Sequence, residues 1–129
     1  MANFLVIAAS STMGRATCKL LQEHGHRVYK TARSGDKITP DSILDATNFE
    51  AVDAIFSLAK QSMGSIDGVV SFAGSLLLKP ASSINQEQYY QTIQSSLTTS
   101  FATVRSAQQQ LRRWLCCSHI FRCSLNWAA

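Results

Sequence analysis

The sequence has no continuous apolar stretch of about 18 residues, which is the length that a membrane span needs. No basic leader precedes its first apolar run, FLVIAA, which starts at Phe4, so the pattern of a secretory signal is missing. Internal repeats, flexible linkers and low-complexity segments are absent as well. From these absences we expect a small cytoplasmic globular protein without a membrane partner.

Charge is also scarce: 16% of the 129 residues are charged, and the formal net charge is +4. Most of this excess comes from Arg112, Arg113 and Arg122, because residues 112–129 hold no acidic residue. Nucleic-acid binding requires a stripe of phosphate-binding cations on one face. Three arginines in one terminal segment do not form such a stripe, so we expect no nucleic-acid partner.

Cysteine is present four times, but no C-x-x-C unit is repeated. In a cytoplasmic protein such cysteines are expected to be free thiols rather than disulfides. A cluster near the end of the chain could be imagined as zinc ligands, but an adjacent cysteine pair is atypical spacing for zinc. This cluster comprises Cys116, Cys117, His119 and Cys123. We therefore predict that the protein has no metal site.

What the sequence does have is an alternation of short apolar runs with helical patterns. The runs NFLVIAA (3–9), HRVYKTA (26–32), SILDAT (42–47) and IDGVVSFAG (66–74) predict four strands. Parallel strands need crossover connections, so this alternation predicts an α/β doubly wound parallel sheet with helices on both faces. In such a sheet the ligand site lies at the carboxyl ends of the strands.

Three helices are expected between and after these strands. Gly25 is placed to end the first, Asn48 to cap the second, and Asn85 with Gln88 to form a capping box at the start of a long third helix. Each helix has apolar residues at helical spacing, which predicts its buried face. These faces are Met13, Ala16, Thr17, Leu20, Leu21 and His24; Val52, Ile55, Phe56, Ala59 and Met63; and Tyr90, Ile93, Leu97, Phe101, Val104 and Leu111.

The turn after the first strand, IAASSTMGRA, resembles the Thr-Gly-x-x-x-Gly-Ile-Gly loop of the short-chain dehydrogenase/reductase family, NAD(P)-dependent oxidoreductases on a Rossmann fold. Ala8, Thr12 and Gly14 stand at its three glycine sites. The resemblance implies that this loop binds the dinucleotide through Ala8, Ser10, Ser11, Thr12, Met13 and Gly14. The alternative is an ordinary strand-to-helix turn with Ser11 or Thr12 as the cap.

Three later loops extend the resemblance, which covers residues 3 to about 111. Arg33 stands where NADP-binding relatives carry a basic residue, so NADP(H) is expected in preference to NAD(H). Asp45 and Ala46 resemble the family's adenine-binding step, although Asp45 could simply cap its loop. VVSFAGS takes the place of Asn-Asn-Ala-Gly, which implies cofactor contacts for Phe72, Ala73 and Gly74.

SSLTTSF on the long helix resembles a further motif, Asn-Leu-x-Gly-x-Phe, in which an asparagine organises a catalytic water. Ser96 stands at that position and is interpreted as a solvated helix residue.

The Tyr-x-x-x-Lys pair through which relatives pass the substrate proton is absent from the sequence. No catalytic residue is therefore assigned. We divide the chain into a partial dinucleotide-binding domain, 1–111, and an atypical segment, 112–129, with the sheet expected to stop after the fourth strand and the long helix. Reading that segment one base later turns each Trp codon into a glycine codon, so a reading-frame shift near Arg112 or Arg113 is one hypothesis for its origin.

Three functional interpretations stay open. In the first, an NADP-dependent carbonyl or alcohol oxidoreductase contains this chain as its amino-terminal half and binds substrate only in its full-length form. In the second, the chain binds a dinucleotide or a partner without turnover, with homo-oligomerisation through helix 85–111. In the third, the chain is an unstable product without a function of its own, because an uncovered apolar sheet edge favours aggregation.

Overall fold

The computed structural model describes residues 1–111, 116–118 and 122–123. Four strands form a parallel sheet: β1 (Asn3–Ile7), β2 (Arg27–Ala32), β3 (Ser42–Ile43) and β4 (Gly68–Ser71). They lie in the order β3-β2-β1-β4, with β1 paired to both β2 and β4. The predicted doubly wound parallel sheet is confirmed, although each strand is shorter than its apolar run.

The sheet continues beyond β4 by two short strands within the segment that sequence analysis set apart. The first, β5 (Cys116–Ser118), pairs in parallel with β4, and the second, β6 (Arg122–Cys123), pairs antiparallel with β5. An unpaired strand edge presents free N–H and C=O groups, and β5 satisfies part of this edge on β4. The zinc hypothesis concerns side chains of this segment that lie outside the described part of the structure. The reading-frame hypothesis concerns residues 112–129, most of which also lie outside it.

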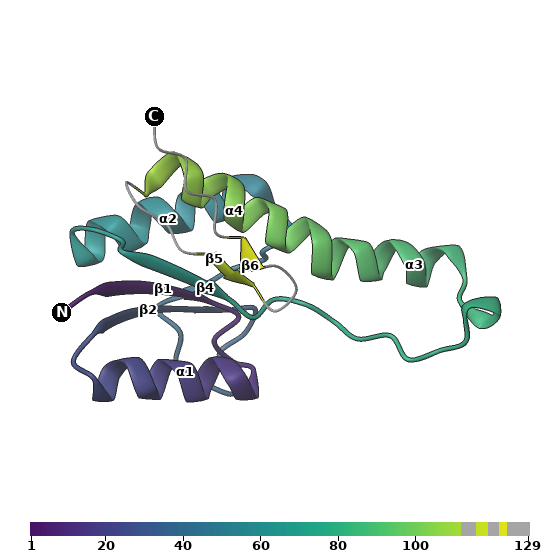
Figure 1. Ribbon diagram of the computed structural model, residues 1–129, viewed down its shortest axis with the longest axis horizontal. Coiled ribbons are helices and arrows are strands. Elements are labelled where there is room, and N and C mark those ends of the chain that lie inside the picture. The colour runs from purple at the N-terminus through teal and green to yellow at the C-terminus, as the bar shows by residue number, and fades with distance from the viewer. Residues whose placement is uncertain (112–115, 119–121, 124–129) are drawn as a thin grey trace.

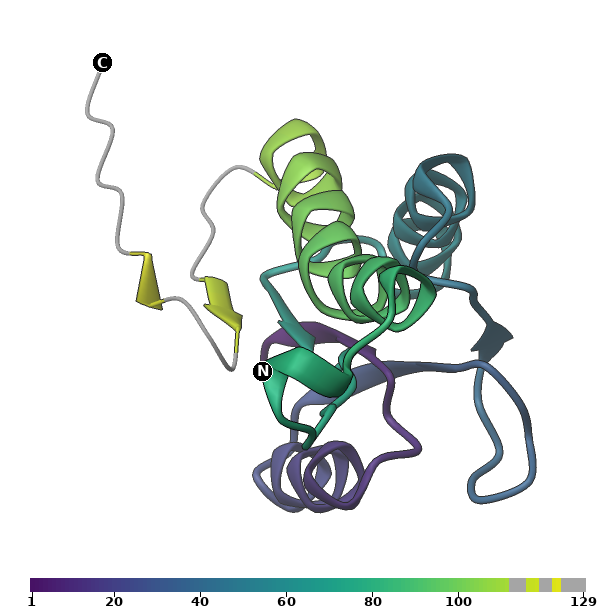
Figure 2. The same ribbon diagram turned by 90° about the vertical axis from the view of Figure 1, so that its right-hand side faces the viewer.

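Helices cover both faces of the sheet, as Figures 1 and 2 show. The first helix, α1 (Thr12–Glu23), lies alone on one face. On the other face α2 (Phe49–Met63) lies beside α4 (Thr99–Gln110). A 3-10 turn, η1 (Ala81–Ser83), and a helix, α3 (Gln86–Ile93), precede α4. No helix of residues 1–111 is long and apolar enough to cross a bilayer.

Alternation along β1 divides the core into two clusters. Leu5 and Ile7 point toward α2 and α4 and belong to the larger cluster. Val6 belongs to the smaller cluster, together with Ala9 and with Cys18, which lies on α1. Successive residues of a strand point to opposite faces, so one short strand contributes to both. The face with two helices therefore carries most of the buried apolar surface.

Local capping predictions are confirmed. The Asn48 side chain accepts a hydrogen bond from the Ala51 backbone N–H, and Asn85 and Gln88 form the expected capping box. Gly25, at φ +78, follows His24, the C-cap of α1, and this is the left-handed position that glycine occupies at little cost. These features depend on a few neighbouring residues, which is why the sequence alone predicts them.

The predicted buried face is right for α2 and wrong for the other two helices. All five α2 residues are buried, but on α1 the buried residues are Gly14 and Cys18, whereas Met13 and Leu20 are exposed. On the long helix the residues that contact the core are instead small, and this inward side comprises Thr99, Ala102, Thr103, Ser106 and Ala107. Small side chains allow the helix backbone to approach α2 and the sheet closely.

Four of the six residues predicted to be buried on the long helix are consequently exposed: Tyr90, Ile93, Leu97 and Phe101. Leu111 is buried as predicted, and Val104 is half-buried. A π-helical turn, η2 (Gln94–Thr98), joins α3 to α4 and shifts the helical phase between them. Periodicity finds an apolar stripe but does not tell which side of a helix faces the core.

Candidate dinucleotide site at the carboxyl edge of the sheet

The carboxyl ends of the parallel strands meet at one edge of the sheet, and the turn between β1 and α1 is its centre. Ala8 adopts a left-handed backbone with φ 58, and its carbonyl oxygen accepts the Ser11 N–H at 3.3 Å. The Ala9 N–H donates to the Thr31 carbonyl of β2 at 2.9 Å. A left-handed conformation favours glycine, so Ala8 occupies a backbone position at which glycine would be less strained.

Ser11 is the cap of α1, as one of the two alternatives predicted. Its Oγ accepts the Gly14 backbone N–H at 2.9 Å. Among the described residues, the N–H groups of Thr12 and Met13 have no hydrogen-bond partner, and both residues are exposed. Free N–H groups at a helix N-terminus, together with the helix dipole, attract anions.

Gly14 is the position in this turn that admits no side chain. A Cβ atom there would lie 2.7 Å from the Ala8 carbonyl oxygen and 2.8 Å from the Ala9 Cα. The helix therefore starts in backbone contact with the end of β1, which brings its free N–H groups to the sheet edge. The turn thus places unpartnered backbone N–H donors at the carboxyl edge of the sheet, where an anion is attracted.

Arg33 and Asp45 lie on the β2 and β3 side of this turn, and both are exposed. One oxygen of Asp45, Oδ1, accepts the Thr47 hydroxyl at 2.7 Å and the Thr47 N–H at 3.0 Å. These bonds lower the pKa of Asp45, with a smaller contribution from the nearby Arg33 cation. Asp45 therefore caps its loop, and the predicted adenine contact stays a prediction. Ala46 is buried in the larger core cluster.

On the other side of the turn, the chain leaving β4 passes through Phe72, Ala73 and Gly74. Phe72 donates its N–H to the Ile7 carbonyl at 2.9 Å and packs against the α1-side cluster, while Ala73 packs against the larger cluster. Gly74 is exposed, and the nearest atom to a Cβ built on it is the Ser96 Oγ at 3.8 Å. Nothing in the described protein thus requires glycine at this position.

Ser96 is not a plain solvated residue, so that interpretation was wrong. Its hydroxyl lies against the backbone of Ser75, accepting the N–H at 3.4 Å and donating to the carbonyl at 3.3 Å. Ser75 and Ser95, whose hydroxyls hydrogen-bond to each other, are not among the residues predicted from the sequence. A one-dimensional pattern does not show this contact, since Ser75 and Ser95 lie 20 residues apart.

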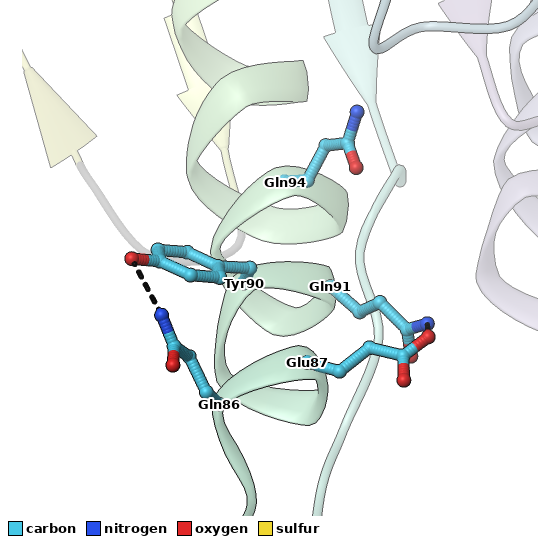
Figure 3. Close-up of a pocket in the computed structure, with 5 residues that line it drawn as sticks. All are labelled: Gln86, Glu87, Tyr90, Gln91 and Gln94. Carbon is cyan, nitrogen blue, oxygen red and sulfur yellow. Dashed lines mark hydrogen bonds between the residues drawn. The ribbon is translucent and has the colours of Figure 1, made fainter.

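The described residues contain no group of three potential metal-ligating His, Cys, Asp or Glu side chains. A hollow of about 540 Å³ lies away from the sheet edge, on α3 (Figure 3). In it Gln86 Nε2 donates to Tyr90 Oη at 3.3 Å, and Gln91 Nε2 donates to Glu87 Oε1 at 3.2 Å. Its polar side chains pair along one helix, so it contributes nothing to the turn at β1.

Comparison with known proteins agrees with this geometry. The family model described as short chain dehydrogenase matches residues 2–115. An uncharacterized oxidoreductase of Staphylococcus aureus strain MW2 is 28% identical over 114 residues, covering 80% of this chain and 49% of the relative. The chain therefore spans about half the length of the curated relatives it matches.

Solved structures show the same fold. A protein from Listeria innocua aligns at a TM-score of 0.70 with 25% identity, covering 85% of this chain and 50% of the other. A protein from Burkholderia cenocepacia, described as a dehydrogenase and solved with bound NADP, aligns at a TM-score of 0.79 with 21% identity, covering 85% and 48%. A short chain dehydrogenase from Mycobacterium smegmatis aligns at 0.79 with 22% identity, covering 86% and 52%.

Proposed function

The chain belongs to the short-chain dehydrogenase family, and from this membership we propose that it binds a nicotinamide adenine dinucleotide at the carboxyl edge of its sheet. The observation that carries the proposal is the β1–α1 turn. There the left-handed Ala8 and the tightly packed Gly14 bring the unpartnered N–H groups of Thr12 and Met13 to a helix N-terminus, a feature that supports anion binding.

Strand order orients the ligand in this proposal. The pyrophosphate lies at the start of α1, contacted by Ser10, Ser11 and Thr12 and the free backbone groups. The adenosine half extends toward β2 and β3, where Arg33, Asp45 and Ala46 lie. The nicotinamide half then extends toward β4, along Phe72, Ala73 and Gly74, because β4 flanks β1 on the side opposite to β2.

NADP(H) is the preferred dinucleotide in this proposal. Arg33 is exposed just past β2, and the residue before it is the buried Ala32 rather than a carboxylate. A guanidinium forms charge-assisted hydrogen bonds to a 2′-phosphate, whereas a carboxylate would repel it. The bound dinucleotide supplies hydride-transfer chemistry, and the residues of this chain bind and orient it.

Fluorescence titration of the purified chain with NADPH and NADH tests this proposal. We expect NADPH to bind more tightly, and Arg33→Ala to weaken NADPH by roughly tenfold, the equivalent of one charge-assisted hydrogen bond, while NADH affinity stays the same. Lys60→Ala on α2 serves as a matched control, since it removes an exposed cation far from the edge. Equal losses for both dinucleotides, or no binding of either, would contradict the proposal.

Turnover by this chain is not part of the proposal. None of its three tyrosines has a lysine four residues later, and Tyr29 is buried with its hydroxyl bonded to Ser42 at 2.6 Å. Interconversion of carbonyls and alcohols is proposed for a full-length form of the protein. We expect no carbonyl-dependent NADPH oxidation by the chain itself across a panel of aldehydes and ketones, and measurable turnover would overturn this expectation.

A cytoplasmic location is proposed together with this function. Cys18 is a buried free thiol, which is typical of reducing compartments.

A second candidate function, self-association, has a separate observation in its favour. Tyr90, Ile93, Leu97 and Phe101 are 37–58% exposed along α3, η2 and α4. A row of large apolar side chains in water marks an interaction surface, and we propose that a second copy covers it. Sedimentation should show a dimer that Leu97→Glu dissociates, whereas Leu58→Glu on α2, also exposed, leaves it intact.

A further inference from the structure

The π turn η2 carries two adjacent serines that hold the chain leaving β4. Ser95 Oγ hydrogen-bonds to the Ser75 Oγ, and Ser96 Oγ contacts both the N–H and the carbonyl of the Ser75 backbone. In a regular α-helix, adjacent side chains point about 100° apart around the axis. The wider π turn reduces the angle between them, so both serines reach one residue.

The carbonyl groups of this turn are occupied as well. The Ser96 carbonyl accepts the Ser100 hydroxyl at 2.7 Å and the Thr99 hydroxyl at 3.3 Å, and the Ser95 carbonyl accepts Thr99 at 2.7 Å. Hydroxyl groups three to four residues later thus bond to the carbonyls of both serines. The hydroxyls thus stabilise the turn in the geometry that presents Ser95 and Ser96 to Ser75.

We propose that Ser95 and Ser96 are positioning residues for the nicotinamide half of the bound dinucleotide. They fix Ser75 at the end of the segment Phe72–Ser75, in which Phe72 and Ala73 pack against the core but Gly74 and Ser75 are exposed and lie outside helix and strand. This inference rests on the proposed dinucleotide site. It adds that the serine contacts govern one half of the ligand and leave the adenosine half, on the β2 and β3 side, unaffected.

Two ligands test the nicotinamide and adenosine halves of the proposed site separately. NADPH contacts both sides of the β1 turn in the proposed orientation, whereas 2′,5′-ADP carries only the adenosine side. We expect the double variant Ser95→Ala/Ser96→Ala to bind NADPH roughly five- to tenfold more weakly, as for the loss of one or two neutral hydrogen bonds. Its affinity for 2′,5′-ADP should stay within about twofold, the difference that a near-neutral surface change produces.

Matched variants exclude a general loss of structure. Ser57 is an exposed residue of α2, and its hydroxyl bonds to the Asp53 carbonyl of the same helix. Ser57→Ala should therefore change the affinity for neither NADPH nor 2′,5′-ADP. Ser96→Thr keeps the hydroxyl and should restore NADPH binding relative to Ser96→Ala. Equal weakening of both ligands by the double variant, or no recovery with threonine, would overturn the positioning role.

Amide hydrogen exchange of the ligand-free chain gives a readout that does not depend on binding. The amides of Gly74 and Ser75 should exchange faster in the double variant, while the Phe72 amide, which donates to the Ile7 carbonyl, and those of β1 and α2 stay protected. Unchanged exchange at Gly74 and Ser75 would overturn the inference even if NADPH binds. If the unmodified chain binds neither ligand, the proposed function fails, and the exchange experiment still decides whether the serines hold the segment.

Discussion

The carbonyl oxygen of Ala8 lies 2.7 Å from the point that a Cβ atom on Gly14 would occupy. Contact between a side chain and backbone at this distance cannot be relieved by rotating a side chain. The two residues therefore form one unit, in which the left-handed Ala8 turns the chain and Gly14 lets α1 start against it. This unit places the helix N-terminus at the sheet edge, and its two members respond differently to substitution.

Gly14→Ala should destabilise the protein, because the added methyl group overlaps the backbone of Ala8 and Ala9. We expect the free energy of unfolding to fall by about 2–3 kcal/mol, as for other overpacked sites, in urea unfolding followed by circular dichroism. Gly35→Ala is the control, since its nearest contacts would lie at 3.9 Å. Similar losses for the two variants would contradict the steric argument.

Ala8→Gly should stabilise the protein slightly. A left-handed alanine costs roughly 1–2 kcal/mol, and the greater freedom of glycine in the unfolded chain offsets about 0.5–1 kcal/mol of the gain. A net increase of about 0.5 kcal/mol should appear as a higher midpoint of thermal unfolding. Ala16→Gly, on the exposed side of α1, should instead lower stability by about 1 kcal/mol; a lower midpoint for Ala8→Gly would disprove the assigned strain.

Gly74→Ala should leave stability unchanged but weaken NADPH. A Cβ on Gly74 would have the Ser96 Oγ at 3.8 Å as its nearest neighbour, which is ordinary contact. In the proposed site, however, the dinucleotide passes this backbone, so the methyl group would meet the ligand. Thermal unfolding and NADPH titration of the same sample distinguish the two effects. A stable variant with unaltered NADPH affinity would place the ligand elsewhere.

Asp53 makes the contact between α2 and α4 dependent on pH. Its carboxylate accepts hydrogen bonds from the buried Ser106 hydroxyl and from Arg105, whose NH1 lies 3.0 Å away. The Ser106 bond, followed by Arg105, lowers the pKa of Asp53. The folded state therefore binds this proton less tightly than the unfolded chain, so the contribution to stability is present above the unfolded-state pKa of about 3.9 and is lost as pH falls through the folded-state pKa.

Asp53→Asn should accordingly lower the free energy of unfolding at pH 7 by about 1 kcal/mol, since the carboxylate is partly screened by water. The difference from the unmodified chain should shrink as the pH is lowered toward 3. Urea unfolding at a series of pH values measures it. A difference for Asp53→Asn that stays constant across this pH range would argue against an ionic contact.

Features that depend on neighbouring residues were predictable from the sequence. The Asn48 cap, the Asn85–Gln88 capping box and the left-handed Gly25 each depend on a few adjacent positions. The apolar face of α2 was also predictable, because this helix has a single apolar stripe and lies directly on the sheet. Alternation of strand and helix then leaves few topologies besides a parallel sheet.

The long helix shows where prediction from sequence ends. Its large apolar residues form one stripe and its small residues another, and both repeat at helical spacing. Close packing against the sheet and α2 selected the small stripe, with Ala102 and Ser106 fully buried. Leu97 and Phe101 were left in water, because the phase of a helix is decided by the surface it meets rather than by its own pattern.

By itself, then, the sequence determined the first four strands, the helix caps and the location of the turn between β1 and α1, since these depend on local backbone preferences and alternation. Only the tertiary structure decided that Ala8 is left-handed, that Ser95 and Ser96 hold Ser75, and that an apolar stripe faces outward. Each of these depends on contacts between segments far apart in the chain, where shape and close packing select among faces that the sequence leaves equivalent.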